Sequence, residues 1–198
     1  MLAEWAEQGH LVRWVHVPDE VPEGELCFML SCSKLVKPEI LARNRHNLVV
    51  HESDLPKGKG WSPMTWQVLE GAEAIPVTLF EAVELVDSGP VYLKDTMVLE
   101  GHELADELRS RQAEVTLRLC REFVQGYPEI IRLGVEQVGD ESFYQRCRPE
   151  DSRLDPHKSI AEQFNLLRVV DNERYPAYFD LKGHRYILKI ERECKVGE

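Results

Sequence analysis

Basic residues are scarce in this sequence: Lys and Arg number 24 against 35 Asp and Glu, which leaves a formal net charge of -11. A surface of that charge repels a phosphate backbone, so nucleic acid is not an expected partner. No apolar run approaches the roughly 18 residues that a transmembrane helix needs. The N-terminal segment MLAEWAEQGH carries acids where a signal peptide would carry a basic flank, so we expect a cytoplasmic protein without a membrane anchor.

Several motifs of catalytic and metal-binding proteins are also missing. The five cysteines are odd in number and scattered, and none forms a CxxC pair, so neither a disulfide framework nor a zinc site is indicated. The glycine patterns of dinucleotide-binding and phosphate-binding loops and the GxSxG turn of hydrolases are absent. No pair of histidines has metal-ligand spacing, and we therefore expect no metal ion.

Apolar patterns alternate between strand-like and helix-like segments over residues 1–140. With 43% hydrophobic residues in a chain of 198, one core of good size is expected, with a small extension. The alternation predicts the α/β class, with an open, mostly parallel, Rossmann-like sheet flanked by helices. The predicted strands are residues 11–17, 25–31, 47–50, 75–84 and 89–99, and the predicted helices are residues 2–8, 37–45, 62–71 and 101–125. The last of these helices carries one apolar stripe: Leu104, Leu108, Val115, Leu119 and Phe123.

The character of the chain changes near residue 141. A polar stretch, a helix and a β-hairpin that turns at Lys182 and Gly183 are predicted over residues 143–159, 160–170 and 175–191. We therefore expect a main domain over residues 1–140 and a C-terminal extension over residues 141–198. An exposed hairpin edge needs a partner or charged guards, so a homodimer through this hairpin is one expectation.

The stretch NLVVHESDLPKGKGWSP, residues 47–63, holds the first candidate site residue. His51 directly follows an apolar strand, and in open α/β sheets ligands bind beyond the carboxyl ends of the strands. Pro56 removes a backbone donor, and Gly58 and Gly60 permit unusual dihedral angles, so the loop is expected to be rigid and to approach a ligand closely. Two plainer interpretations stay open, a hydrogen-bonded structural histidine and a surface turn with solvated lysines.

Asp87 is the second candidate. It lies in VDSGP, residues 86–90, a turn between two predicted strands. A carboxylate beside His51 would fix the tautomer of the imidazole and orient it as a general base. The plainer interpretation is an ordinary turn, because an acid near Gly-Pro is common turn chemistry.

These residues resemble a known family. HESDLPKGKGWSP, residues 51–63, is similar to the His-x-Ser-x-Leu-Pro-x-x-Arg-Gly-x-x-Pro pattern of the folate-dependent formyltransferases, which include methionyl-tRNA, glycinamide ribonucleotide and sugar-amine enzymes. Lys59 stands where the usual arginine would be. VDSGPVYL resembles the family's Asp-x-Gly loop, SCSKLVKPEIL its folate-binding segment, and RCRPEDSRLD with NLLRVVDNERYP the C-terminal region of the sugar-modifying members. The matching positions in the first pattern are His51, Ser53, Leu55, Pro56, Gly60 and Pro63.

The resemblance implies an enzyme that transfers a formyl group from 10-formyltetrahydrofolate to a small-molecule amine, without a metal ion. His51 would take a proton from the attacking amine or steady the tetrahedral oxyanion, and Asp87 would orient His51 and an ordered water. The implied folate pocket consists of Lys34, Leu35, Val36, Leu55 and Pro56, together with the backbone of Glu84, Leu85 and Val86.

Two departures from the family pattern matter. Val49 stands where the family has an asparagine, and valine cannot donate a hydrogen bond to an oxyanion. Loss of one such donor costs about 10²–10³ in rate. Asn47, Ser53 or a backbone N–H could replace it, although Asn47 lies about 7 Å further back along the strand. The chain also starts inside the family's first helix, so a first strand is expected to be missing, through a truncated start or a shortened fold.

The expected acceptor is a nucleotide-linked amino sugar in surface glycan biosynthesis. A tRNA acceptor calls for a larger, basic C-terminal domain, whereas about 55 residues follow residue 143 here and the net charge is -11. Two alternatives stay open. One is a catalytically inactive folate- or ligand-binding relative, which Val49 favours, and the other is a methionyl-tRNA formyltransferase.

Overall fold

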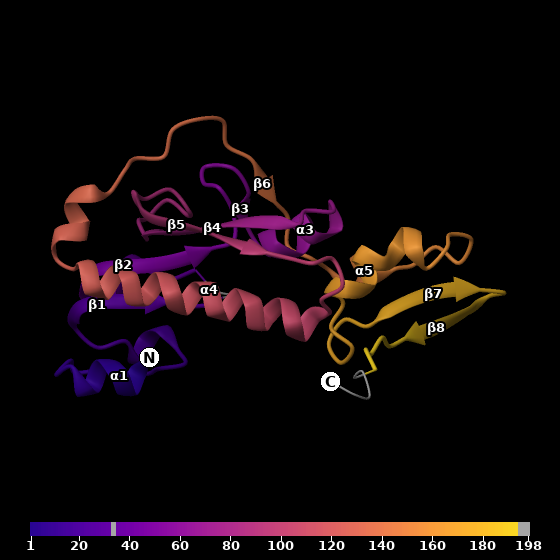
Figure 1. Ribbon diagram of the computed structural model, residues 1–198, viewed down its shortest axis with the longest axis horizontal. Helices are drawn as coiled ribbons and strands as arrows, with labels where there is room; N and C mark the ends of the chain where they lie inside the picture. The colour runs from indigo at the N-terminus through magenta and orange to yellow at the C-terminus, as the bar shows by residue number, and fades with distance from the viewer. Residues whose placement is uncertain (33–34, 194–198) are drawn as a thin grey trace.

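The centre of the fold is a four-stranded sheet in the order β1-β2-β4-β5. Its strands are β1 (Gly24–Met29), β2 (Asn44–His51), β4 (Ala74–Glu81) and β5 (Val91–Val98). The computed structural model describes residues 1–32 and 35–193. Helices lie along this sheet (Figure 1), so the predicted α/β class with an open sheet is confirmed.

Strand direction divides the sheet into two parts. β1 and β2 are parallel, while β4 runs antiparallel to both β2 and β5. The connection from Glu81 to Val91 is too short for a parallel neighbour, because a parallel crossover takes about a dozen residues or more. The sheet is therefore mixed, and the predicted parallel pairing is found at β1 and β2 but not at β4 and β5.

The long helix α4 (Ala105–Gly126) covers one face of the sheet (Figure 1). α1 (Leu2–Glu7) packs beside this core through Trp5, whose ring stacks on Phe28 with 5.6 Å between centroids. In the described part of the chain, no helix is both long and apolar enough to cross a membrane. The predicted stripe of α4 is confirmed for the residues that are buried in the main core: Leu108, Val115, Leu119 and Phe123.

The opposite face of the sheet carries loops instead of a long helix. Side chains of β2 alternate, so that Leu48 faces the main core while Val49 packs on the other side against a small cluster: Leu55, Phe80 and Val91. A long connection, residues 134–145, arches over this face (Figure 1). It ends in β6 (Phe143–Tyr144), which pairs in parallel with β3 (Lys59–Gly60). We call residues 134–145 the crossing segment.

Shorter elements connect the strands: η1 (Pro18–Glu20), α2 (Pro38–Leu41), α3 (Pro63–Leu69) and η2 (Glu129–Leu133). α2 ends earlier than the predicted helix over residues 37–45, and β2 begins at Asn44 instead of residue 47. The reason is tertiary pairing, because Asn44 and His46 are already aligned with β1. Sheet pairing has overridden the local helical pattern there.

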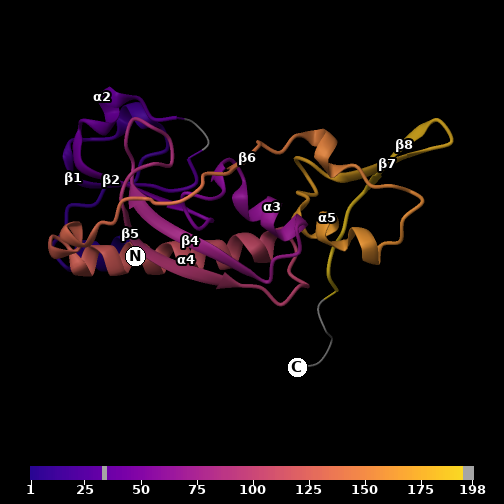
Figure 2. The same ribbon diagram turned by 90° about the horizontal axis from the view of Figure 1, so that it is seen from above.

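The C-terminal part of the chain contains η3 (Pro149–Ser152), η4 (Ala161–Gln163), α5 (Phe164–Val169), β7 (Ala177–Leu181) and β8 (His184–Leu188). β7 and β8 form an antiparallel hairpin, and φ is 50° at Lys182 and 80° at Gly183, as a tight hairpin turn requires. The predicted helix and hairpin are therefore confirmed. Figure 2 shows the hairpin projecting away from the sheet. A small core of its own lies beneath it: Leu154, Leu167, Val170 and Ala177.

Residues 11–17 do not form the predicted strand. β1 is the outer strand of the sheet, and residues 11–17 do not pair with it. A strand needs a neighbour to satisfy its backbone groups, so the β-branched pattern of LVRWVHV is not sufficient by itself. Leu11, Trp14 and Val17 are exposed instead.

Candidate active site

His51 is the last residue of β2, and its side chain is buried. Its Nε2 lies 2.9 Å from the carbonyl oxygen of Gly58. A carbonyl oxygen can only accept a hydrogen bond, so Nε2 carries the proton in this contact. The lone pair of the neutral imidazole is then on Nδ1, which is the ring atom that can accept a proton.

Asp87 lies beside His51, in the loop that joins β4 to β5. Its Oδ2 accepts a hydrogen bond of 3.0 Å from the backbone N–H of Gly60 and lies 3.9 Å from Nε2 of His51. Both side chains are largely buried, with 9% of His51 and 12% of Asp87 exposed. The fold therefore brings the two predicted residues together. Their separation is that of an electrostatic contact and is too long for a direct hydrogen bond.

Two glycines let the backbone segments of the site come close together. Gly60 has a φ of +99°, and a Cβ there would lie 2.5 Å from the carbonyl oxygen of Tyr144. A Cβ on Gly89 would lie 1.9 Å from the carbonyl oxygen of Glu81. Neither position has room for a side chain. The rigid, close-approaching loop predicted after His51 thus lies against the crossing segment.

Lys59 is a buried residue of the site that the sequence analysis missed. It is 2% exposed, and its Nζ donates hydrogen bonds of 2.8 Å to Oγ of Ser88 and 2.5 Å to Oε1 of Glu141. The interpretation as a surface turn with solvated lysines is therefore wrong for Lys59. Glu141 is 82 positions away, so no local pattern indicates this contact. The one available signal was that Lys59 stands where the family pattern has another cation.

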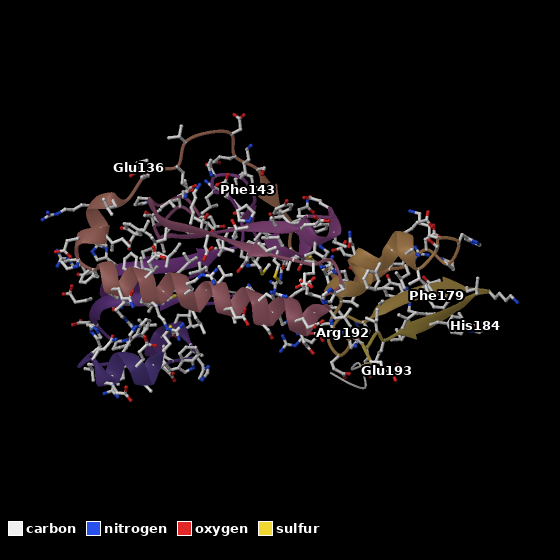
Figure 3. The ribbon with its side chains drawn as sticks, viewed as in Figure 1. Glu136, Phe143, Phe179, His184, Arg192 and Glu193 are labelled. Carbon is white, nitrogen blue, oxygen red and sulfur yellow. The ribbon has the colours of Figure 1, made fainter. Side chains whose placement is uncertain are left out.

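The crossing segment binds both loops of the site. Oγ and the carbonyl oxygen of Ser142 accept hydrogen bonds from the backbone N–H groups of Gly58 and Lys59, at 2.8 and 2.9 Å. Nε2 of Gln137 donates to the backbone carbonyl oxygens of Asp87 and Gly89, at 3.1 and 2.8 Å. Figure 3 shows Glu136 and Phe143 on this segment, on the side of the sheet away from α4. No residue of this segment is predicted from the sequence to belong to the site.

Of the two side-chain candidates for oxyanion support, Ser53 has the free hydroxyl. Nδ2 of Asn47 donates to the backbone carbonyls of Leu41 and Asn44, at 2.9 and 3.4 Å, so its donor hydrogens are engaged near α2. Ser53 is 2% exposed, and its Oγ is buried without a hydrogen-bond partner among the described residues. Buried polar groups of this kind are rare in folded proteins. The structure therefore distinguishes Ser53 from Asn47.

The residues implied to hold folate lie on three loops. Leu55 and Pro56 are buried, and Leu55 packs against Phe80 and Val91. The loops after β1 and β4 carry exposed or half-exposed side chains: Leu35, Val36, Glu84, Leu85 and Val86. Lys34 lies outside the described residues.

A hollow of about 430 Å³ adjoins Leu55, between β5 and the crossing segment. This volume is within the range of small-ligand pockets. Oε1 of Gln137, one of its lining residues, is buried and has no hydrogen-bond partner among residues 1–32 and 35–193. The apolar part of its wall consists of Leu55, Val91, Leu93, Leu133, Val135 and Val138.

Tyr144, a titratable residue beside these loops, adds no further nucleophile. Burial, reinforced by the carboxylate of Glu70 at 2.9 Å, raises the pKa of Tyr144 to about 12, so this residue stays a neutral phenol. In the portion of the chain that the structure describes, no group of three or more His, Cys, Asp or Glu side chains is arranged to hold a metal ion. The polar chemistry of the site therefore rests on His51, Asp87, Ser53 and Lys59.

Comparison with known proteins identifies the family. Residues 20–123, which include His51 and Asp87, match the family described as formyl transferase. The chain belongs to the formyl transferase family. One curated relative is the methionyl-tRNA formyltransferase of Thermodesulfovibrio yellowstonii. It is 27% identical to this formyl transferase family member over 172 residues, which cover 84% of this chain and 54% of that protein. The methionyl-tRNA formyltransferase of Thermosipho melanesiensis is 29% identical over 165 residues, covering 83% and 50%. The chain thus spans about half the length of the curated relatives it matches.

Solved structures share the fold of this formyl transferase family member. The methionyl-tRNA formyltransferase from Clostridium thermocellum aligns with a TM-score of 0.71 at 21% identity, over 86% of this chain and 74% of that chain. A 4-N formyltransferase from Francisella tularensis aligns with a TM-score of 0.67 at 16% identity, over 86% and 72%. HypX from Aquifex aeolicus in complex with tetrahydrofolic acid aligns with a TM-score of 0.66 at 17% identity, over 84% and 29%. The family resemblance stated from residues 51–63 is confirmed.

Proposed function

We propose that this chain transfers the formyl group of 10-formyltetrahydrofolate to the amine of a nucleotide-linked amino sugar. The proposal is carried by the buried pair of His51 and Asp87, 3.9 Å apart at the end of β2 and inside the region that matches the family. Formyl transfer needs one group that takes a proton from the attacking amine and another that stabilises the developing negative charge. The site holds candidates for both roles on short, well-anchored loops.

His51 is the proposed proton acceptor. Since Nε2 donates its hydrogen to the carbonyl oxygen of Gly58, Nδ1 of the neutral ring is free to accept the proton that the amine loses on attacking the formyl carbon. The resulting imidazolium lies next to the carboxylate of Asp87. Because both side chains are largely buried, this negative charge stabilises the positive ring more strongly than it would in bulk solvent.

Ser53 is the proposed donor to the oxyanion. Val49 packs into an apolar cluster and has no hydrogen to donate, while the amide of Asn47 is engaged elsewhere. The hydroxyl of Ser53 is buried and unpartnered within the described residues, and it lies close to the loop after His51, since a Cβ on Gly58 would come within 2.9 Å of Cβ of Ser53. Ser53→Ala should lower kcat by about 10²-fold or more, as loss of an oxyanion donor does in other enzymes.

The folate moiety is proposed to bind across the loops that surround this pair. Support comes from the apolar side chains of Leu35, Leu85 and Val86, which are exposed and can pack against a flat aromatic ring. Leu55 and Pro56 are buried in the loop after His51 and belong to the proposed pocket as well. Val36 and Glu84 belong to the same loops and are included in the proposed pocket, and Lys34 is retained from the family resemblance.

A sugar acceptor is supported by the distribution of charge. The net charge of the chain is -11, and residues 141–198 contain equal numbers of basic and acidic side chains, whereas a tRNA acceptor calls for a positive surface. Two arginines of this region, Arg153 and Arg185, are also paired, since both contact Asp180. Methionyl-tRNA stays the second candidate acceptor, since the quoted curated relatives are methionyl-tRNA formyltransferases.

We also propose that residues 1–140 are the formyl-transferring domain, whose loops Glu141 and Ser142 help to anchor, and that the C-terminal extension over residues 141–198 pairs two copies of the chain through its hairpin. The separate small core under the hairpin and the exposure of Tyr186 and Ile187, at 46% and 57%, support this arrangement. Light scattering should then find a dimer at micromolar concentration. A monomer that is fully active would contradict the role proposed for the hairpin.

The activity is tested with the purified chain, 10-formyltetrahydrofolate and a panel of acceptors, namely nucleotide-linked amino sugars and methionyl-tRNA, by following the release of tetrahydrofolate. His51→Ala and Asp87→Asn should each lower kcat by about 10²-fold or more, as losing a general base or its orienting acid does. His102→Ala and Asp106→Asn are the matched controls. Their side chains are 48% and 96% exposed outside the site, and turnover should not change.

Each alternative predicts a different result in this assay. Donor binding without turnover across the whole panel, including methionyl-tRNA, would refute the transferase proposal in favour of an inactive relative. Turnover with methionyl-tRNA alone would replace the sugar as acceptor while leaving the chemistry of His51 in place. Full activity in His51→Ala would refute the mechanism.

A further inference from the structure

Lys59 is a buried cation at the meeting point of three segments. Its side chain is 3% exposed, while that of Glu141 is 50% exposed. A buried ammonium group loses its hydration, and this is tolerated when charged or polar partners replace the water. Oγ of Ser88 and Oε1 of Glu141 are those partners, at 2.8 and 2.5 Å from Nζ. Lys59 therefore joins the loop after β2, the loop after β4 and the crossing segment.

Two successive residues of β3 bind two successive residues of the loop after β4. Nζ of Lys59 binds Oγ of Ser88, and the backbone N–H of Gly60 binds Oδ2 of Asp87. β3 is itself anchored, because it pairs with β6 of the crossing segment. The two contacts thus hold Asp87 and Ser88 against a strand that is itself fixed, and we call these two contacts the clamp.

The clamp also acts on a residue with an uncommon backbone conformation. The φ of Asp87, 52°, is in the left-handed region, which few residues other than glycine adopt, although aspartate is among those that tolerate it. Without contacts that hold it, the loop is free to relax toward ordinary dihedral angles and to turn the carboxylate away. Gln137 adds a third contact, from Nε2 to the carbonyl oxygen of Asp87. Of these three contacts, the one from Lys59 involves a full positive charge, and charge-assisted hydrogen bonds are the stronger ones.

We propose that Lys59 is a positioning residue that fixes the carboxylate of Asp87 beside His51, acting through Ser88, and that Glu141 holds Lys59 in place. The consequence for catalysis rests on the proposed function, whereas the placement of Asp87 rests on geometry alone. Lys59 binds neither reacting group, so its effect on rate is indirect. A displacement of about 1 Å in a catalytic constellation can cost on the order of a hundredfold in rate.

The first readout is the amide resonance of Gly60 in NMR spectra of the full chain. Because this N–H donates to the carboxylate of Asp87, Asp87→Asn should shift its resonance, and we call that shift the Gly60 response. Lys59→Met keeps most of the aliphatic stem and removes the charge, and it should abolish this response. Lys59→Arg should preserve it, since a guanidinium can donate to both Ser88 and Glu141. Lys189→Met is the matched control, because Lys189 forms an ion pair of the same length, 2.5 Å, with Glu173 in the C-terminal part of the chain.

The second readout is the formyl-transfer assay. Lys59→Met should lower kcat on the order of tenfold to a hundredfold, with little change in KM for the donor. Lys59→Arg keeps a cation at this position, so both of its readouts should be close to those of the unchanged chain. Glu141→Gln alters the half-exposed partner without opening the core, and it should weaken the Gly60 response and lower kcat in the same direction. If Lys59→Met does not fold, the Gly60 response and kcat of Glu141→Gln test the proposal in its place.

The outcomes separate this inference from the proposed function. A chain without any turnover, but with a Gly60 response that disappears in Lys59→Met, would refute the proposed function and support the positioning of Asp87. A Gly60 response and kcat that survive in both Lys59→Met and Glu141→Gln would overturn the inference. Failure of Lys59→Arg to restore either readout would overturn it as well, because a cation at this position would then not be sufficient.

Discussion

The ion pair between Glu103 and Arg168 joins the segment before α4 to α5, and the two side chains are only 1% and 3% exposed. Arg168 donates from Nη2 to Oε2 of Glu103 at 3.0 Å and from Nε to its backbone carbonyl oxygen at 3.1 Å. Removing the guanidinium leaves a buried carboxylate with less compensation for its lost hydration. Arg168→Met keeps much of the apolar stem and removes the charge, and it should destabilise the protein strongly.

The magnitude follows from what remains around the carboxylate. Loss of one partner of a buried ion pair costs about 3–5 kcal/mol. The backbone N–H groups of Glu100 and Gly101 still donate to Glu103, at 2.7 and 3.0 Å. We therefore expect the lower end of the range, about 3 kcal/mol in the free energy of unfolding. At about 2–4 °C per kcal/mol for a chain of this size, Tm should fall by about 6–12 °C.

Thermal and urea unfolding followed by circular dichroism measure this loss. Arg109→Met is the matched control, because Arg109 pairs with Asp171 at 2.8 Å while its own side chain is 51% exposed, and the cost there should stay below about 1 kcal/mol. The double variant Glu103→Gln with Arg168→Met should recover part of the loss, since no buried charge is left without its partner. Equal losses in Arg168→Met and Arg109→Met would refute the reasoning.

Acid should weaken the same region. Burial opposes ionisation of Glu103, but the surrounding backbone amides and Arg168 outweigh it and lower the pKa of the carboxyl below 4.5. The stabilisation by the ionised carboxylate is therefore complete above pH 4.5 and is lost as the pH falls through the pKa of the folded state. The free energy of unfolding of Glu103→Gln should then depend less on acid pH than that of the unchanged chain. Val49→Asn should raise kcat about tenfold or more, because it adds a donor to the oxyanion. It should also lower the free energy of unfolding by about 1–3 kcal/mol, because an amide enters an apolar cluster. A lower kcat would contradict the role proposed for an oxyanion donor. Gly89→Ala should reduce the free energy of unfolding by more than about 1 kcal/mol, measured in urea, because its Cβ would lie 1.9 Å from a backbone carbonyl oxygen of β4. Burial raises the pKa of Cys120 to about 12, so a maleimide followed by mass spectrometry should label exposed Cys32 in the native protein and Cys120 only after unfolding.

Elements that depend on near neighbours were predictable. The stripe of α4 repeats at the helical period, and the turn at Lys182 and Gly183 places glycine where a positive φ is needed, so both are visible in short windows of sequence. Residues 11–17 have an equally clear strand pattern and yet form no strand. The difference is that a helix satisfies its own backbone, while a strand depends on a neighbour that the pattern cannot supply.

The site shows the same division. The residue types of His51 and Asp87 and the turn chemistry around them were sufficient to nominate both, and the family pattern made the nomination specific. The tautomer of His51 was not accessible in this way, because it is set by the carbonyl of Gly58 after the loop has folded back. The strand directions at β4 and β5 were likewise decided by the length of their connection and the pairing it allows.

Lys59 marks the limit of what local patterns reveal about this protein. In the sequence it is one of two lysines in a polar loop, and its surroundings predict a solvated side chain. In the folded chain its ammonium group is buried and donates hydrogen bonds to Ser88 and Glu141, which lie 29 and 82 positions away in the sequence. Periodicity and turn residues report on interactions within a few residues. The charge environment of the site, by contrast, is completed by Glu141 of the crossing segment, whose path across the sheet only the folded chain defines.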